Sequence, residues 1–171
     1  RPQRRTASAE HQQRCYGIEL DPVTDVVVTT GASEAIAAAL LALVDTGDEV
    51  VMFSPWFDLY AAAVGLAGGT RVEVPLTAGD FRPDAEALRS AITPRTRLLL
   101  LNSPHNPTGS VFTRDELTAI AAVVEEHDLW VISDEAYEHL VYSGAEHVPF
   151  STIPGMAERT IVVNGFSKSY A

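Results

Sequence analysis

Short runs of aliphatic residues alternate along the chain with longer alanine-rich or amphipathic stretches. The short runs have the β-branched or leucine-rich composition of buried strands, and they end at glycine, proline or polar residues. They predict strands at Val26–Thr30, Glu49–Phe53, Arg71–Val74, Leu98–Asn102, Trp130–Asp134 and Ile161–Val163. The longer stretches predict helices at Ser33–Leu43, Phe57–Leu66, Asp84–Ala91 and Arg114–His127. This alternation is typical of an α/β fold, a three-layer α/β/α sandwich with a mainly parallel central sheet.

Local signals complete this outline. Thr113, followed three residues later by Glu116, predicts a capping box at the start of the last helix, and Gly47 closes the region after the first helix. No internal repeat, low-complexity segment or linker divides the sequence. Residues 1–15 are therefore expected to form a helical lead-in, and residues 16–171 a single domain that is truncated before its end.

Composition and charge exclude several classes of protein. With 46% hydrophobic residues the chain can bury a core, and its net charge of -11 disfavours nucleic acid and anionic membranes as partners. The longest apolar run, Ala35–Val44, has ten residues and is too short to cross a bilayer. A lone cysteine, Cys15, excludes an internal disulfide and favours a cytoplasmic location. A sequence that starts without methionine is expected to begin inside a longer one.

Candidate chemistry follows the predicted strands, at the sheet edge where α/β proteins bind ligands. The first candidate is Thr29–Ala35, which turns through Gly31 into a helix. Its backbone N–H groups and the positive end of the helix dipole can bind a phosphate. The alternative is that Ser33 is an ordinary helix N-cap.

The second candidate is the loop Asn102–Gly109. Its two prolines and its glycine restrict the backbone, so Asn106 is expected to have a preset orientation. The loop could also be a simple turn. His105, in the same loop, is expected to pack against its surroundings rather than to catalyse a reaction.

The third and fourth candidates are a carboxylate and an amine. Asp134 ends a buried strand, with Tyr137 three residues later, and a carboxylate in this place requires a cation unless it caps a following helix. Lys168 follows the last strand, where its amine can attack an aldehyde, although most lysines are solvated surface groups.

Together the candidates supply the parts of one site. An amine can form a Schiff base, a carboxylate can hold a pyridine nitrogen protonated, and a helix start can bind a phosphate. Phe57 adds an aromatic face that can stack on a flat ring, unless it packs in the core.

With these motifs the chain resembles the large domain of the class I/II aminotransferases, which are fold-type-I pyridoxal 5'-phosphate enzymes. The resemblance extends over Tyr16–Ala171. It is carried by Asn102–Gly109, Ser133–Leu140 and Asn164–Lys168, and Asp45–Val50 is similar to the stretch before the family's next strand.

The resemblance implies roles for the residues at the reacting centre. Lys168 would form the Schiff base with the cofactor and move the proton at the substrate's α-carbon. Asp134 would pair with the pyridine nitrogen. Tyr137 and Asn106 would donate hydrogen bonds to the phenolic oxygen of the ring, and Asn106 would also lie near the substrate carboxylate.

The resemblance also implies how the rest of the cofactor is held. Phe57 would stack on the ring, while Ala32, Ser33 and Ser167 would bind the phosphate. Gly165 departs from the pattern, because many members of the family have a phosphate-binding serine there.

Other parts of the family's site lie outside the sequence. The chain stops at Ala171, before the family's phosphate-binding arginine, and has neither the small domain nor the tyrosine that reaches a partner's phosphate. A partial site, inactive by itself, is therefore expected, and the full-length protein is expected to be a homodimer.

The function expected is transfer of an amino group between an amino acid and a 2-oxo acid. A β-lyase on the same scaffold, a nucleotide-binding Rossmann module and a non-catalytic fragment are alternatives. The sequence contains no G-x-G-x-x-G motif after a strand, which disfavours the Rossmann alternative. No metal-ligating residues are predicted.

Two geometric expectations follow. Lys168 and Asp134 should lie on one side of the sheet, with the helix start at Ser33 facing the same crevice. By resemblance, the Ser54–Pro55 and Asn106–Pro107 peptide bonds are expected to be cis.

Overall fold

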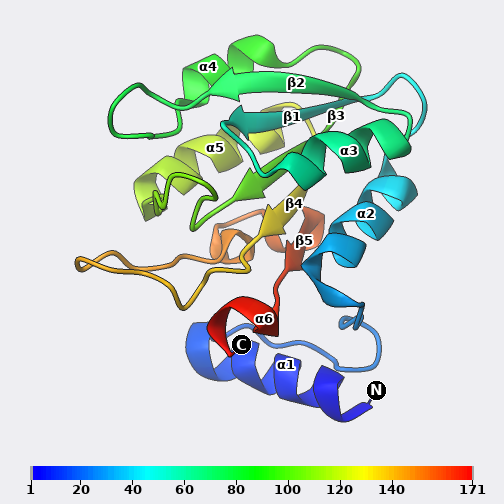
Figure 1. Cartoon of the computed structure of the whole chain (residues 1–171), viewed down its shortest axis with the longest axis vertical. Helices are drawn as coiled ribbons and strands as arrows, with labels where there is room; N and C mark the ends of the chain where they lie inside the picture. Colours follow the sequence, from blue (N-terminus) through cyan, green and yellow to red (C-terminus); the bar gives the residue numbers. More distant parts are fainter. Residues whose placement is uncertain (1, 171) are drawn as a thin grey trace.

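A computed structural model describes residues 2–170, in which five parallel strands form one sheet (Figure 1). The strands are β1 (Glu49–Ser54), β2 (Thr70–Pro75), β3 (Thr96–Asn102), β4 (Trp130–Asp134) and β5 (Thr160–Val163). Their order across the sheet is β2-β1-β3-β4-β5. Five of the six predicted strands are thus confirmed, with ends shifted by at most two residues.

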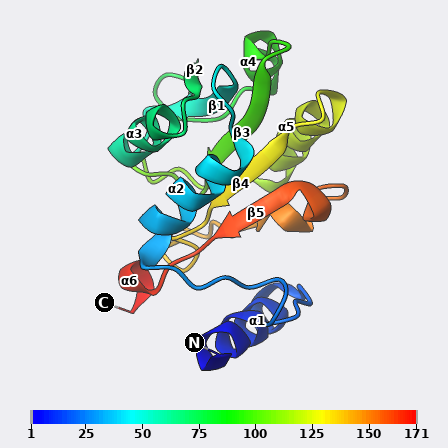
Figure 2. The ribbon, with the colours of Figure 1, turned by 90° about the vertical axis from the view of Figure 1, so that its right-hand side faces the viewer.

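Four helices cover the two faces of the sheet, namely α2 (Gly31–Leu43), α3 (Asp58–Leu66), α4 (Ala85–Ala91) and α5 (Arg114–Glu126). Helix α1 (Pro2–Tyr16) lies apart from these layers, and the short α6 (Phe166–Ser169) follows β5 (Figure 2). Two 3-10 turns, η1 (Phe150–Thr152) and η2 (Ala157–Arg159), precede β5. Figure 2 shows α2 and α3 on one side of the sheet and α4 and α5 on the other. The three-layer α/β/α architecture is confirmed. Within residues 2–170, no helix is long and apolar enough to cross a membrane.

Both faces of the sheet are apolar. Successive side chains of a strand point in opposite directions, so an unbroken run of aliphatic residues places apolar side chains on both faces. Val51, Leu99 and Val131 belong to one buried cluster, which includes Leu117 and Val124 of α5. Their strand neighbours Val50, Leu98, Leu100 and Ile132 belong to a second cluster, which includes residues of α2 and α3. The unbroken aliphatic runs of the sequence therefore reflect two cores that share one sheet.

The predicted strand at Val26–Thr30 is wrong. This segment has no regular secondary structure, and Val27 is 81% exposed. Its β-branched composition suits an extended backbone, but a strand also requires hydrogen bonds to a neighbouring strand. In the described part of the chain the sheet ends at β5, which pairs with β4, and Val26–Thr30 does not join it.

The predicted capping box is present at the start of α5 and has a measurable consequence. The Thr113 hydroxyl accepts a hydrogen bond from the Glu116 N–H at 3.3 Å, and the Thr113 N–H donates to the Glu116 carboxylate at 2.7 Å. Thr113→Ala removes the hydroxyl acceptor and is expected to lower the free energy of unfolding by about 1 kcal/mol, as measured by urea denaturation. Thr118→Ala, on the exposed side of the same helix, is the control, with an expected change below about 0.5 kcal/mol. Equal effects of the two substitutions would contradict the assignment to capping.

Candidate active site

The carboxyl ends of three neighbouring strands lie side by side. In the strand register Asn102 of β3 is opposite Asp134 of β4, which is opposite Val163 of β5. The loop after β3, the turn after β4 and the segment leading into α6 therefore start at one edge of the sheet (Figure 1). All of these segments carry residues that the sequence selected.

Asp134 is buried and hydrogen-bonded at this edge. Its side chain accepts a hydrogen bond from the Tyr60 hydroxyl at 2.6 Å and another from the Ala136 N–H at 3.1 Å. Burial raises the pKa of the Asp134 carboxyl, and the two hydrogen bonds partly oppose that effect. The alternative that Asp134 caps a following helix is wrong, because Ala136–His139 is a turn.

Tyr60 was not selected from the sequence. It lies in α3, three residues after Phe57, and is itself only 2% exposed. Burial and the neighbouring carboxylate raise the pKa of the Tyr60 hydroxyl, so it remains a hydrogen-bond donor to Asp134. The ring of Phe57 meets the ring of Tyr60 edge-on, with 5.8 Å between the ring centroids, and Phe57 is 42% exposed. The sequence did offer a signal for Tyr60, because a residue three positions after Phe57 on a helix lies on the same face as Phe57.

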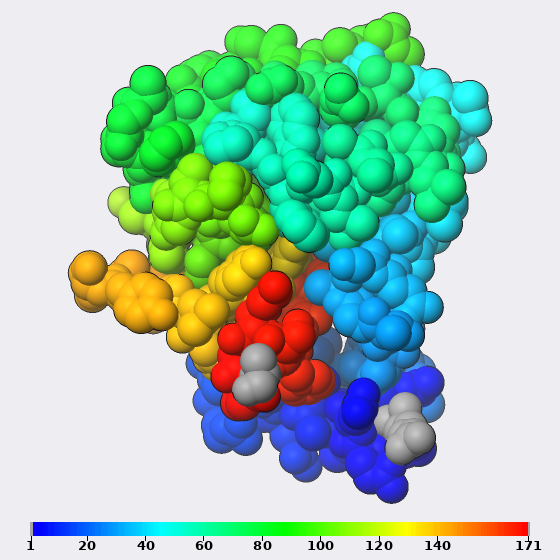
Figure 3. Space-filling model, viewed as in Figure 1, coloured from blue at the N-terminus to red at the C-terminus, as the bar shows by residue number. Residues whose placement is uncertain are grey.

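Lys168 lies close to both Tyr137 and Asp134. Its Nζ atom is 5.8 Å from the centroid of the Tyr137 ring, and its charge counteracts part of the effect of burial on the pKa of Asp134. Figure 3 shows α6, which carries Lys168, at the surface between α1, α2 and the segment after β4. Lys168 is also the single lysine among the 171 residues, a signal that sequence reasoning overlooked. The structure thus brings the predicted amine, carboxylate and phenol together.

The loop after β3 is fastened by Asn102. The Asn102 side-chain amide donates to the backbone oxygens of Pro104 at 3.0 Å and Asp134 at 2.8 Å. Its carbonyl oxygen accepts from the backbone N–H of Asn106 at 2.7 Å. Asn106 is half-buried, and one buried side chain therefore ties its backbone to the strand end that carries Asp134.

Both predicted cis peptide bonds, Ser54–Pro55 and Asn106–Pro107, are present, and Ser103–Pro104 is cis as well. His105 packs inside the loop, stacked on Phe112 at a centroid distance of 6.0 Å. Burial lowers the pKa of His105 to about 4, so it is neutral at physiological pH.

The start of α2 lies next to the start of α6. A Cβ atom on Gly165 would be 3.9 Å from the Cβ of Ala32, so the two backbones approach closely there. The alternative that Ser33 is the N-cap is wrong, because α2 begins at Gly31 and Ser33 lies in its first turn. Ser33 and Ser167 are both exposed, on the two short segments that meet at this point.

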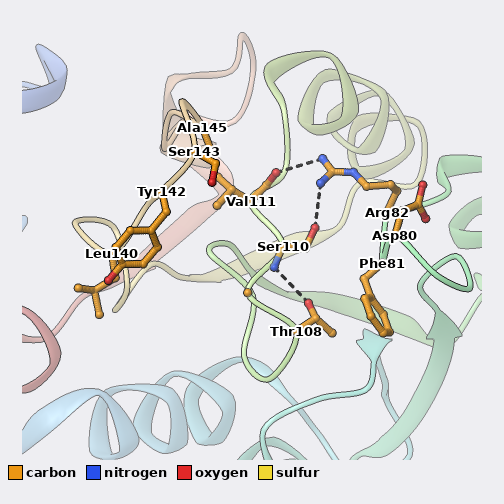
Figure 4. A pocket seen from close by; sticks show the side chains of 11 residues that line it. Asp80, Phe81, Arg82, Thr108, Ser110, Val111, Leu140, Tyr142, Ser143 and Ala145 are labelled. Atoms are coloured by element: carbon orange, nitrogen blue, oxygen red, sulfur yellow. Dashed lines mark hydrogen bonds between the residues drawn. The ribbon is translucent and has the colours of Figure 1, made fainter.

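A separate hollow of about 360 Å³ lies beyond the far end of the Asn106 loop (Figure 4). Thr108 and Ser110 line it, but Asn106 itself and the other predicted site residues do not. The guanidinium of Arg82 faces Ser110 at 2.9 Å and the Val111 oxygen at 3.0 Å, and it also pairs with Glu116. The positive charge of Arg82 is therefore already paired with Glu116 within the protein.

Proteins of known family match the chain over its whole length. The family model described as aminotransferase class I and II matches residues 1–171. A probable N-succinyldiaminopimelate aminotransferase, DapC, of Mycobacterium tuberculosis is 50% identical over 168 residues, which cover 97% of this chain and 42% of that protein. An aspartate aminotransferase of Pyrococcus abyssi is 45% identical over 171 residues, which cover 99% of this chain and 44% of the relative.

Solved structures agree with these matches. The structure of N-succinyldiaminopimelate aminotransferase from Mycobacterium tuberculosis superposes with a TM-score of 0.94 at 51% identity, covering 96% of this chain and 43% of that one. The chain therefore spans less than half the length of the relatives it matches. The resemblance inferred from the sequence motifs is confirmed.

Proposed function

The chain belongs to the class I and II aminotransferase family, and from this premise we propose that it supplies the pyridoxal 5'-phosphate-binding core of an enzyme that transfers an amino group between an amino acid and a 2-oxo acid. The observation that carries the proposal is the convergence of Lys168, Asp134 and Tyr137 at one edge of the sheet. An amine, a buried carboxylate and a phenol in one place are the groups that this cofactor requires.

The residues present fit the cofactor. Burial raises the pKa of the Asp134 carboxyl and so disfavours its charged form. A protonated pyridine nitrogen beside it would favour the ionised carboxylate again. Phe57 offers an exposed aromatic face near Asp134, because its ring contacts the ring of Tyr60, whose hydroxyl donates a hydrogen bond to Asp134. The N-terminus of α2 at Ala32 and Ser33 provides N–H groups and a hydroxyl for the phosphate.

Each residue has a separate task in the reaction. When bound, the cofactor supplies an electron sink for the electron pair left on the substrate's α-carbon. Lys168 accepts the α-proton and returns it, which requires that its amine be held near the substrate. Asp134, oriented by Tyr60, favours a protonated nitrogen. Tyr137 and Asn106 would donate hydrogen bonds to the phenolic oxygen of the cofactor ring. The Asn102 side chain positions Asn106 by accepting a hydrogen bond from its backbone N–H.

The wider setting is also proposed. By family resemblance the full-length protein is a homodimer, and the single Cys15 favours the cytoplasm. The names of the relatives point to different amino acids, namely N-succinyldiaminopimelate, aspartate and methionine, at 40% to 50% identity. Overall identity therefore does not select a substrate for this protein.

The test is an exchange assay with the full-length protein. Pyridoxal 5'-phosphate should give the protein a yellow absorbance, and an amino donor with a 2-oxo acid should yield the exchanged pair of products. The donors to compare are those named for the relatives. Release of free ammonia in place of a new amino acid would identify a lyase instead. Protein that stays colourless and inactive with every donor would contradict the proposal.

A further inference from the structure

Three side chains that have no part in the proposed function meet beside α1. His11 comes from the middle of α1, and Glu138 and His139 come from the turn after β4. One ligand atom from each lies within 4.8 Å of the other two. The Nε2 atoms of His11 and His139 are 2.9 Å apart, and they lie 3.6 Å and 3.5 Å from Oε1 of Glu138.

These separations suit a single transition-metal ion. Two ligands bound to tetrahedral Zn²⁺ at about 2.0–2.1 Å must lie about 3.3 Å from each other. The three observed distances, 2.9, 3.5 and 3.6 Å, bracket that value. Two imidazoles and one carboxylate are also a donor set that zinc commonly takes, with a fourth position left for water.

The carboxylate at the centre of the cluster has an unused acceptor. Glu138 has a side chain only 4% exposed, and its Oε2 atom is buried without a hydrogen-bond partner. Its other oxygen accepts from the Asn164 amide. A buried carboxylate with an unpartnered oxygen is costly, and a cation bound at Oε1, the oxygen measured to both imidazoles, would offset part of that cost by neutralising the charge.

The two imidazoles face each other through the same nitrogen atoms. At 2.9 Å, two bare Nε2 atoms repel each other through their lone pairs and two protonated ones clash. Without a metal, one ring must therefore adopt the opposite tautomer, whereas one metal ion can accept both lone pairs. The side-chain nitrogen of Gln12 lies 3.5 Å from Nδ1 of His11, and rotating the amide by about 180° would place its oxygen there to accept the remaining ring N–H.

From this geometry we propose that His11, Glu138 and His139 bind one Zn²⁺ ion, which clamps α1 to the turn that carries Tyr137. His139 is 34% exposed, which gives the ion a route of entry. The sequence pattern did not predict this site, because 128 positions separate the two histidines and no local ligand spacing exists.

The test measures zinc binding without cofactor or substrate, so its result is independent of the proposed function. Full-length protein without an affinity tag is stripped with a chelator and titrated with ZnCl₂ by calorimetry. We expect one ion per chain, and we expect Zn²⁺ to raise the melting temperature because it binds the folded state. His11→Ala and His139→Ala should each weaken zinc binding by more than about tenfold. Loss of a residue that only hydrogen-bonds to a metal ligand already costs at least about tenfold in affinity, and these variants lose a ligand itself.

His127→Ala is the matched control, because His127 lies at the end of α5, outside the cluster. It should leave the affinity unchanged. Melting curves of the zinc-free variants separate loss of a ligand from loss of the fold, and a folded His139→Ala protein that binds weakly supports the site. No binding by the unaltered protein would overturn the proposal. Equal losses of zinc affinity in all three histidine variants would also overturn it, and so would an unchanged affinity in all three.

Discussion

Replacing Lys168 with alanine is expected to abolish amino-group transfer and to remove the yellow absorbance of the protein with pyridoxal 5'-phosphate. Lys168 is the single lysine of this chain, so no other side-chain amine within residues 1–171 can take its place. A positioned general base contributes about 10²–10⁴-fold to a reaction rate. We expect a loss at the upper end of that range, because the same amine also joins the cofactor to the protein.

Two further variants isolate the amine from the charge. Lys168→Arg keeps a positive charge near Asp134 but has no reactive amine, and it should be as inactive as Lys168→Ala. Ser169→Ala, one position later, should retain activity. Borohydride reduction of the yellow protein should add the mass of the cofactor to the peptide that contains Lys168. Substantial turnover by Lys168→Ala would remove this residue from its proposed role.

Asp134→Asn is expected to weaken cofactor binding and turnover together by a factor between about 10² and about 4 × 10³. Removing one partner of a buried ion pair costs about 3–5 kcal/mol, and each 1.4 kcal/mol corresponds to about a factor of ten. Asparagine has the same shape but a single oxygen, so it loses the charge and can accept only one of the two hydrogen bonds, from Tyr60 or from the Ala136 N–H. Tyr60→Phe removes a single hydrogen bond to that charge and should cause a smaller loss, about tenfold. Equal losses in the two variants would indicate that local geometry, not charge, is responsible.

The same substitution should have the opposite effect on the stability of the cofactor-free protein. Burial raises the pKa of Asp134 above its ordinary value of 3.8. The folded state therefore holds this proton more tightly than the unfolded state, and the resulting stabilisation is present at low pH and lost as the pH rises through the folded pKa. At neutral pH we expect Asp134→Asn to unfold at an equal or higher urea concentration than the unaltered protein. The difference should shrink as the pH falls toward 3.8, and a less stable asparagine variant at neutral pH would contradict this account.

Local patterns in the sequence were sufficient for most of the fold. The aliphatic runs at Leu98–Asn102 and Trp130–Asp134 predicted strands because a parallel strand is covered on both faces and must be apolar throughout. The capping box at Thr113 was visible because all of its contacts lie within four residues. The candidate residues Asp134 and Lys168 could be selected for a related reason, since in a parallel sheet all strands deliver their following residues to the same edge.

Contacts between distant segments could not be predicted in this way. Val26–Thr30 has the composition of a strand but lacks a neighbour in the sheet, and pairing depends on where other segments lie. Tyr60 contacts Asp134 across 74 positions, and His11 contacts His139 across 128. Periodicity specifies which way a side chain faces along its own helix or strand, whereas the partner it meets depends on how the packed elements are arranged in space.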